Sequence, residues 1–193
     1  MLSTTINIAI FASGNGTNAR NMIEYFSGAS IRIALVVCNR PGVGVISVAE
    51  NHAVPVLMIQ RDSFYSDESC LNQLRDYSID WLVLAGFLWK IPPTLVAAYP
   101  GKIINIHPAL LPKYGGKGMY GHHVHEAVIR AKETESGISI HFVDEVYDNG
   151  EMIEQAKCSI EKWDTALTLA AKIHMLEQAI FPAAVERVIK AKA

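Results

Sequence analysis

Cysteine is scarce in this chain, and neither sign of charge is in excess. The three cysteines, Cys38, Cys70 and Cys158, are odd in number and far apart in the sequence, so they predict neither a disulfide framework nor a zinc site. Unpaired cysteines favour a reducing compartment, and we expect a cytoplasmic protein. Lys and Arg total 17 against 19 Asp and Glu, a formal net charge of −2. This balance argues against a nucleic-acid partner, which needs a basic surface.

Long hydrophobic runs are also missing. The longest uncharged apolar run covers residues 81–89, well short of the roughly 20 residues that cross a membrane as a helix. The first basic residue is Arg20, so the start of the chain lacks the positive charge of a signal peptide. We therefore expect no membrane partner. With 50% hydrophobic and 19% charged residues among 193, the composition predicts a folded chain, and its length suits one domain over residues 1–193.

Short β-branched runs alternate with segments that suit helices. This pattern predicts an α/β fold, a doubly wound (Rossmann-like) and mostly parallel sheet with helices on both faces. Two neighbouring strands late in the chain predict an antiparallel addition near the C-terminal part. We expect strands at residues 6–12, 31–37, 54–59, 81–85, 102–106, 137–143 and 152–160, and helices ending at Phe26 and covering residues 45–52, 63–77, 122–132 and 163–190.

The last predicted helix carries both a capping signal and a breaking signal. Asp164 or Thr165 can cap its first turn through a side-chain oxygen. Pro182 lacks a backbone N–H, so we expect it to kink or break the helix.

A glycine-rich segment, SGNGTN (residues 13–18), follows the first strand and opens a helix. Glycines let the backbone approach a phosphate, and the free N–H groups of a helix start attract the anion. A tight turn without a ligand is the alternative. The segment also fits a dinucleotide fingerprint, but the second strand ends in Asn39 and Arg40 with no carboxylate for a ribose. Arg40 leaves NADP open, and the phosphate of a smaller substrate fits at least as well.

Polar residues follow the strand at residues 102–106, where α/β sheets bind ligands. Asn105 and His107 share one side of an extended segment because side chains alternate. An amide and an imidazole there can stabilise an oxyanion, and His107 can also carry a proton. Asp148 lies in the acidic turn after the next strand, and it can orient His107. The alternatives are a histidine and an asparagine that only satisfy loop backbone, and a turn that is merely solvated or a weak cation site.

Three histidines, His122, His123 and His125, cluster in the sequence. They do not make a complete metal-ligand set, so we expect phosphate contact or plain surface rather than a metal site.

Four motifs together resemble one enzyme family. SGNGTN, LAGF, NIHPALLPKY and SIHFVDEVYDNG occur in this order, and the chain from Ile6 to about Val188 is similar to the phosphoribosylglycinamide formyltransferases. These are folate-dependent enzymes of purine biosynthesis, within a wider formyltransferase superfamily. The resemblance implies transfer of a formyl group from 10-formyltetrahydrofolate, as co-substrate, to the primary amine of glycinamide ribonucleotide. It implies no metal.

The resemblance also implies roles for individual residues. The expected phosphate-binding half covers about residues 1–100, and the catalytic and folate half about residues 101–193. A cis peptide is expected at Leu111–Pro112. The implied catalytic residues are Asn105, His107 and Asp148, with His107 protonated. The resemblance also implies that the substrate phosphate is held by Gly16, Thr17 and Asn18, and that Glu177 contacts the ribonucleotide. The residues implied to lie against the folate are Leu88, Trp89, Lys90, Ile91, Asn105, Asp144, Glu145, Val146, Tyr147 and Asp148.

The chain also departs from the family pattern. The segment GGKGMYGHH (residues 115–123) is longer than the usual connection, and Trp89 and Asp67 stand where basic residues are expected to contact folate. Other readings are a formyltransferase acting on a sugar-nucleotide amine, a formyltetrahydrofolate hydrolase and, in a different class, an NADP-binding oxidoreductase. We expect small-molecule substrates and a monomer or weak homodimer.

Overall fold

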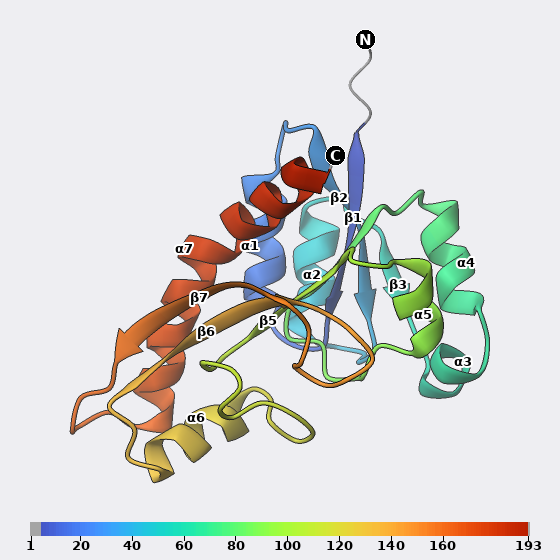
Figure 1. Ribbon diagram of the computed structural model, residues 1–193. Coiled ribbons are helices and arrows are strands. Elements are labelled where there is room, and N and C mark those ends of the chain that lie inside the picture. The colour runs from blue at the N-terminus through green and yellow to red at the C-terminus, as the bar shows by residue number, and fades with distance from the viewer. Residues whose placement is uncertain (1–4, 193) are drawn as a thin grey trace. The chain divides into compact units, whose positions relative to one another are not determined.

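A computed structural model describes residues 5–192 (Figure 1). The chain forms two compact units, one ending at Ile103 and the other beginning at Ile104. Whether they act as one formyltransferase domain stays a prediction. The first unit contains β1 (Ile6–Ala12), α1 (Thr17–Tyr25), β2 (Ile31–Cys38), α2 (Gly44–Asn51), β3 (Val56–Met58), α3 (Arg61–Ser66), α4 (Ser69–Asp76), β4 (Trp81–Leu84) and α5 (Pro93–Ala98), and the second contains β5 (Ile103–His107), α6 (His122–Arg130), β6 (Glu135–Phe142), β7 (Met152–Ser159) and α7 (Ala166–Lys192).

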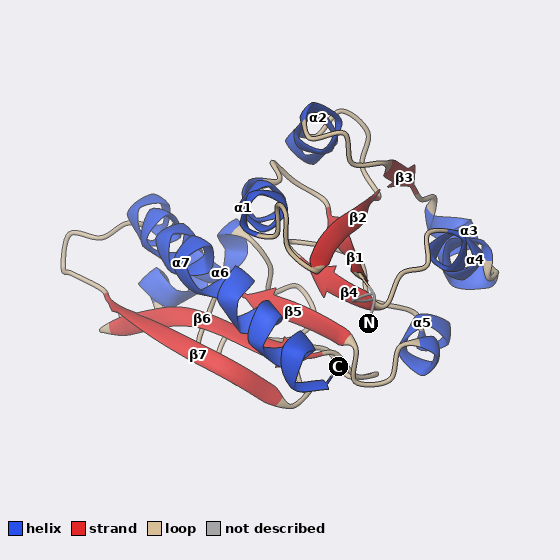
Figure 2. Ribbon diagram, turned by 90° about the horizontal axis from the view of Figure 1, so that it is seen from above, coloured by secondary structure: helices blue, strands red, loops and turns tan. Residues whose placement is uncertain are grey.

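The strands of the first unit are parallel and lie in the order β3, β2, β1, β4. Residues 8–11 of β1 pair with residues 81–84 of β4, and all eight are buried. Such burial is expected for a sheet covered on both faces. Figure 2 shows α1 and α2 on one side of these strands and α4 and α5 on the other. The predicted doubly wound parallel arrangement is therefore confirmed.

Two helices of the first unit differ from the prediction. The single helix expected over residues 63–77 is wrong, because α3 ends at Ser66 and α4 begins at Ser69. Asp67 lies between them in extended backbone, and its Oδ1 accepts the Ser69 N–H at 2.8 Å. A side chain that bonds the backbone two residues on favours a turn over a continuous helix. The second difference is α5, which begins at Pro93, a favoured first helical position for proline, and which the sequence analysis missed.

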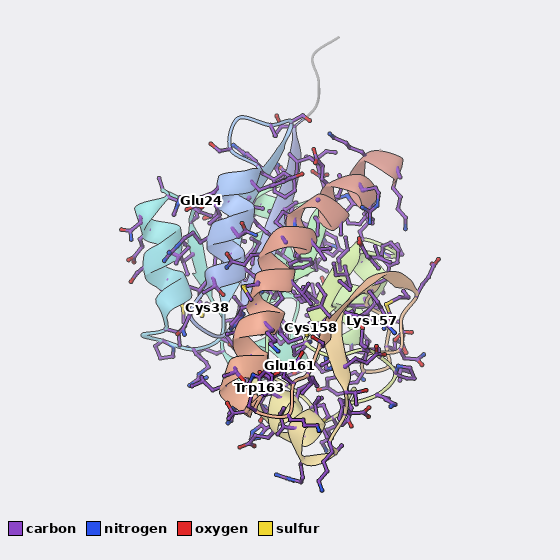
Figure 3. All side chains as sticks on the ribbon, turned by 90° about the vertical axis from the view of Figure 1, so that its left-hand side faces the viewer. Glu24, Cys38, Lys157, Cys158, Glu161 and Trp163 are labelled. Atoms are coloured by element: carbon purple, nitrogen blue, oxygen red, sulfur yellow. The ribbon has the colours of Figure 1, made fainter. Side chains whose placement is uncertain are left out.

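The strands of the second unit are antiparallel. β5 pairs with β6, and β6 pairs with β7, so the predicted antiparallel addition is confirmed. α7 contacts β6 and β7 and also packs against α6. In Figure 2, α7 runs along the strands on one face. Figure 3 shows Cys158 on β7 and Glu161 and Trp163 in the turn that leads into α7.

The start of α7 matches one predicted cap, and its interior contradicts the predicted break. Thr165 Oγ1 accepts the Thr168 N–H at 3.3 Å, and Thr168 Oγ1 accepts the Thr165 N–H at 2.9 Å. This reciprocal pair satisfies two N–H groups at the helix start. Pro182 lies inside α7 without ending it. It is buried, together with Phe181 and Val185, and such packing offsets the lost hydrogen bond.

Candidate active site

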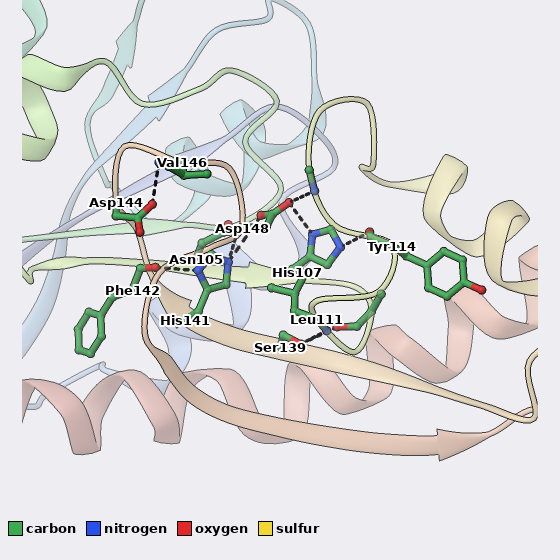
Figure 4. A network of polar contacts seen from close by, with 12 residues as sticks. Asn105, His107, Leu111, Tyr114, Ser139, His141, Phe142, Asp144, Val146 and Asp148 are labelled. Atoms are coloured by element: carbon green, nitrogen blue, oxygen red, sulfur yellow. Dashed lines mark hydrogen bonds and ion pairs between the residues drawn. The ribbon is translucent and has the colours of Figure 1, made fainter.

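Antiparallel pairing of β5 with β6 sets four polar side chains on one face of the second unit. Asn105 lies directly opposite His141, and His107 lies opposite Ser139. Side chains two residues apart in a strand point to the same face, so Asn105 and His107 share one face, and so do Ser139 and His141. Three of these side chains, His107, Ser139 and His141, are buried. Figure 4 shows how the network continues from them to the turn that contains Asp148.

His107 is held at both ring nitrogens. Its Nε2 lies 2.8 Å from the Tyr114 carbonyl oxygen, and its Nδ1 lies 3.7 Å from Asp148 Oδ2 (Figure 4). A carbonyl only accepts hydrogen bonds, so Nε2 carries the proton. The ring is 4% exposed, and this burial lowers the pKa of His107 despite the opposing effects of the Asp148 charge and the Tyr114 carbonyl. Burial therefore disfavours the protonated form of His107, and the protonated His107 that the resemblance implies for the reaction stays a prediction.

Asp148 is an ionised carboxylate between two imidazoles. Its Oδ2 accepts the Gly116 N–H at 2.8 Å, and its Oδ1 lies 3.6 Å from His141 Nε2. Burial raises the pKa of Asp148, but the contacts with His141, Gly116 and His107 outweigh burial and bring it below its ordinary value. A buried carboxylate with its charge retained can take a proton from a reacting group.

Glycine at position 115 allows the loop to approach this carboxylate. A Cβ on Gly115 would lie 2.5 Å from Leu111 Cδ2 and 3.3 Å from Asp148 Cβ. The loop before it is fixed by Ser139, whose Oγ donates to the Ala109 carbonyl at 2.7 Å and accepts the Leu111 N–H at 2.9 Å. The predicted cis peptide at Leu111–Pro112 is present.

His141 links Asn105 to Asp148. Its Nδ1 donates to the Phe142 carbonyl at 2.7 Å, and its Nε2 lies 3.1 Å from Asn105 Nδ2 and 3.6 Å from Asp148 Oδ1. The three residues predicted to be catalytic, Asn105, His107 and Asp148, therefore belong to one connected network.

The predicted phosphate-binding segment lies in the first unit, at the start of α1. Gly16 is the residue before the helix and has φ +78°, and it makes no side-chain cap hydrogen bond. A Cβ at Gly16 would lie 2.6 Å from Val45 Cα, so glycine is required here for packing as well as for conformation. Thr17 is exposed at the first helical position.

The predicted folate segment of the first unit, Leu88 to Ile91, packs beside aromatic side chains. The Leu88 N–H donates to Ser13 Oγ at 3.0 Å, and the Lys90 carbonyl accepts from Tyr65 Oη at 3.0 Å. The Arg61 guanidinium lies over the rings of Tyr65 and Trp89. A basic side chain thus reaches this segment from α3, although Asp67 and Trp89 occupy the positions where the resemblance leads one to expect bases.

The second predicted folate segment, Asp144 to Asp148, is a turn with an ordered start. Asp144 Oδ1 accepts the Val146 N–H at 2.7 Å. Val146 and Tyr147 are exposed large apolar residues, 58% and 43% exposed. Such exposure suits contact with a flat aromatic ligand.

Glu177 is buried on α7 at 6% exposure, and His174 Nδ1 lies 3.0 Å from its Oε2. His125, on α6, is buried to the same degree, and its Nδ1 has no hydrogen-bond partner among the described residues. Burial is the main cause that lowers the pKa of His125 to about 4, against the opposing charge of Glu177. His122 and His123 are exposed and contact Glu126.

The comparisons with known proteins agree with this geometry. A protein family described as formyl transferase matches residues 6–185. The chain belongs to the formyl transferase family. Its relatives include a phosphoribosylglycinamide formyltransferase of Bacillus subtilis, 34% identical over 94% of this chain and 93% of the relative, and a chloroplastic one of Arabidopsis thaliana, 39% identical over 86% of this chain. The chain spans 59% of the length of the Arabidopsis relative.

A solved structure supports the same assignment. The phosphoribosylglycinamide formyltransferase of Bacillus halodurans matches with a TM-score of 0.86 at 36% identity, over 97% of both chains. The fold and the family implied by the sequence motifs are thus confirmed. The roles of individual residues in this formyl transferase stay predictions.

Sequence reasoning missed His141. The signal was present, because Ser139 and His141 alternate in the predicted strand 137–143 and so share one face. What was missing was the register, which sets His141 opposite Asn105. Tyr114 was missed for another reason: its part in the site is its backbone carbonyl, which leaves no trace in residue type.

Other expectations concern metals, membranes and cysteines. Within residues 5–192, no group of His, Cys, Asp or Glu is arranged to hold a metal ion. None of the helices described is long and apolar enough to cross a membrane. Cys38, Cys70 and Cys158 are free, and the first two are buried.

Proposed function

We propose that this formyl transferase moves a formyl group from 10-formyltetrahydrofolate to the primary amine of glycinamide ribonucleotide. The observation that carries the proposal is the connected network of Asn105, His107, His141 and Asp148, which provides a hydrogen-bond donor and proton acceptors around one point. The named relatives that match over nearly their full length favour this acceptor.

The chemistry is acyl transfer without a covalent enzyme intermediate. The neutral amine attacks the formyl carbon, a C–N bond forms, and the carbonyl oxygen becomes an oxyanion. Collapse of this intermediate breaks the bond between the formyl carbon and the folate nitrogen. The amine loses one proton and the folate nitrogen gains one, so the transfer balances without an oxidant or a metal.

Each polar side chain has a role in these steps. Asn105 Nδ2 lies beside His141 Nε2. It can donate to the oxyanion instead, because a negatively charged oxygen is the stronger acceptor. Asp148, ionised and partly buried, accepts the amine proton directly or through one water. His107 carries the proton to the leaving folate nitrogen. His107 and Asp148 lie close enough for a proton to pass between them through small movements.

The substrates are recognised by other segments. The N–H groups at the start of α1, with Gly16, Thr17 and Asn18, bind the phosphate of the ribonucleotide. Glu177 accepts hydrogen bonds from the ribose. The folate lies against the segments Leu88 to Ile91 and Asp144 to Asp148.

The proposal extends to the whole protein. It acts as one formyltransferase domain in the cytoplasm, as a monomer or weak homodimer, on small molecules only. The folate is a co-substrate, and the reaction needs no metal, no nucleic acid and no membrane.

The test is an absorbance assay with the stable donor 10-formyl-5,8-dideazafolate and glycinamide ribonucleotide. We expect release of the deformylated folate only when the ribonucleotide is present. Release without an acceptor indicates a hydrolase instead. Release that needs a sugar-nucleotide amine in place of the ribonucleotide contradicts the proposed acceptor.

A further inference from the structure

The tautomer of His107 is set by the loop after β5. The Nε2–H donates to the Tyr114 carbonyl, and so the unprotonated nitrogen of the neutral ring is Nδ1, which faces Asp148. The opposite tautomer would leave the Tyr114 carbonyl facing a lone pair. The position of the Tyr114 carbonyl therefore favours the Nε2–H tautomer. The contacts that hold this carbonyl in place then also hold the tautomer.

Tyr114 does not adopt its backbone conformation freely. Its φ is +56°, in the left-handed region that a residue with a Cβ seldom occupies. Two glycines follow it, and the N–H of the second, Gly116, donates to Asp148 Oδ2. One turn of three residues thus contacts both His107 and Asp148 through its backbone.

The side chain of Tyr114 anchors this turn to Glu133. The Tyr114 hydroxyl donates to Glu133 Oε1 at 2.9 Å, and Lys113 Nζ donates to the same oxygen at 2.9 Å. Glu133 belongs to the short connection between the end of α6 at Arg130 and the start of β6 at Glu135. Its side chain is 25% exposed, whereas that of Lys113 is 68% exposed.

We infer that Glu133 is a positioning residue of the formyl-transfer site. It holds the Tyr114 hydroxyl, which keeps the Tyr114 carbonyl on Nε2 of His107 and thereby keeps Nδ1 as the basic nitrogen beside Asp148. The effect on catalysis rests on the proposed function, but the effect on the tautomer does not. A purely structural contact between loop and connection would change stability and leave the tautomer unaltered.

The experiment reads the tautomer in the protein without substrate. Two-bond ¹H–¹⁵N correlation spectra at pH 7.5 distinguish Nε2–H from Nδ1–H imidazole, and the His107→Gln variant assigns the His107 signals. We expect Nε2–H in the wild type and a measurable Nδ1–H fraction in both Tyr114→Phe, which removes one hydroxyl, and Glu133→Ala. Glu133→Gln keeps an acceptor for the Tyr114 hydroxyl, and its Nδ1–H fraction should lie between those of the wild type and Glu133→Ala. Lys113→Met removes the other partner of Glu133 and should retain the wild-type tautomer.

Kinetics supply the second reading. Tyr114→Phe and Glu133→Ala should lower kcat about tenfold, the factor that one net hydrogen bond supplies, with KM for the ribonucleotide unchanged. Wild-type tautomers in both variants would overturn the inference, as would a raised KM with unchanged kcat. A shifted tautomer in a protein whose wild type transfers no formyl group would support Glu133 as the anchor and refute the proposed function.

Discussion

At the scale of single residues, the site depends on a carboxylate that keeps its charge although it is largely buried. Asp148 is 12% exposed, and desolvation alone would favour its neutral form. Contacts with His141, with the Gly116 N–H and with His107 together bring the pKa of Asp148 below its ordinary value. A proton acceptor with a retained charge is what attack by an amine requires, so the reaction should depend on the charge of Asp148.

Asp148→Asn removes this charge and keeps the size of the side chain. We expect kcat to fall by about 10²–10⁴, the usual contribution of a general acid–base group, and KM for both substrates to change little. Steady-state kinetics with the dideazafolate donor measure both constants. Glu151→Gln, the same chemical change at an exposed carboxylate directly before β7, serves as the control. A variant Asp148→Asn with wild-type turnover would remove Asp148 from the mechanism.

Residue patterns alone brought two of the network's side chains together. Asn105 and His107 share a face through simple alternation, which the sequence states directly. His141 and Tyr114 enter through strand register and through a backbone carbonyl. Neither property is encoded in the spacing of residue types, so both required the three-dimensional structure.

At the scale of elements, the start of α1 is the proposed phosphate site. Thr17 is its first residue, and Gly16 before it has no side chain that could cap the helix start. Gly16 is a poor position for a test, because any Cβ there would collide with Val45. Thr17 is exposed and can be changed without disturbing the packing of the helix.

Thr17→Val replaces the hydroxyl with a methyl group of similar size. If the hydroxyl donates to the phosphate, its loss costs about 1.5–3 kcal/mol, which is roughly a 10–100-fold rise in KM for the ribonucleotide. Both kcat and KM for the folate donor should stay near wild type. Thr17→Ser keeps the hydroxyl and should behave as wild type. Equal KM values for the valine and serine variants would take Thr17 out of the phosphate site.

The packing of α6 against α7 buries a histidine whose Nδ1 has no hydrogen-bond partner within residues 5–192. The pKa of His125 is about 4 in the folded protein against an ordinary value of 6.5. The unfolded chain therefore binds a proton at a higher pH than the folded chain does. The stability that His125 contributes is present above about pH 6.5 and is lost as the pH falls from there toward 4.

This shift predicts acid sensitivity that one substitution reduces. At about 1.4 kcal/mol per pH unit, the lost stability approaches ~3 kcal/mol by pH 4. Urea unfolding between pH 4 and pH 7 should show a shallower loss of free energy for His125→Leu than for the wild type. His122→Gln, at an exposed position on the same helix, should follow the wild type. Parallel curves for His125→Leu and the wild type would contradict the assignment.

Helix ends were harder to predict from the sequence than strands. Each of the seven strands that the structure describes lies at a predicted position, and in β1, β2, β4 and β5 the predicted run is mostly buried. The break at Asp67 depends on one side-chain hydrogen bond, and α7 continues past Pro182 because its surroundings are packed. Local propensity does not report either effect.

At the scale of the whole molecule, fold and family were both within reach of the sequence. The alternation of strands and helices predicted the parallel first unit, and the motif order implied the formyl transferase family that the comparisons confirm. The acceptor depends on how phosphate, amine and folate are recognised together, and only the reaction itself tests that.

The most direct measurement follows the formyl carbon. The wild-type protein is incubated with glycinamide ribonucleotide and a donor whose formyl group carries ¹³C, and the products are read by NMR. The account predicts the label in an amide on the ribonucleotide, in an amount equal to the folate released. Label in free formate with the ribonucleotide unchanged, or label that stays on the folate, would contradict it.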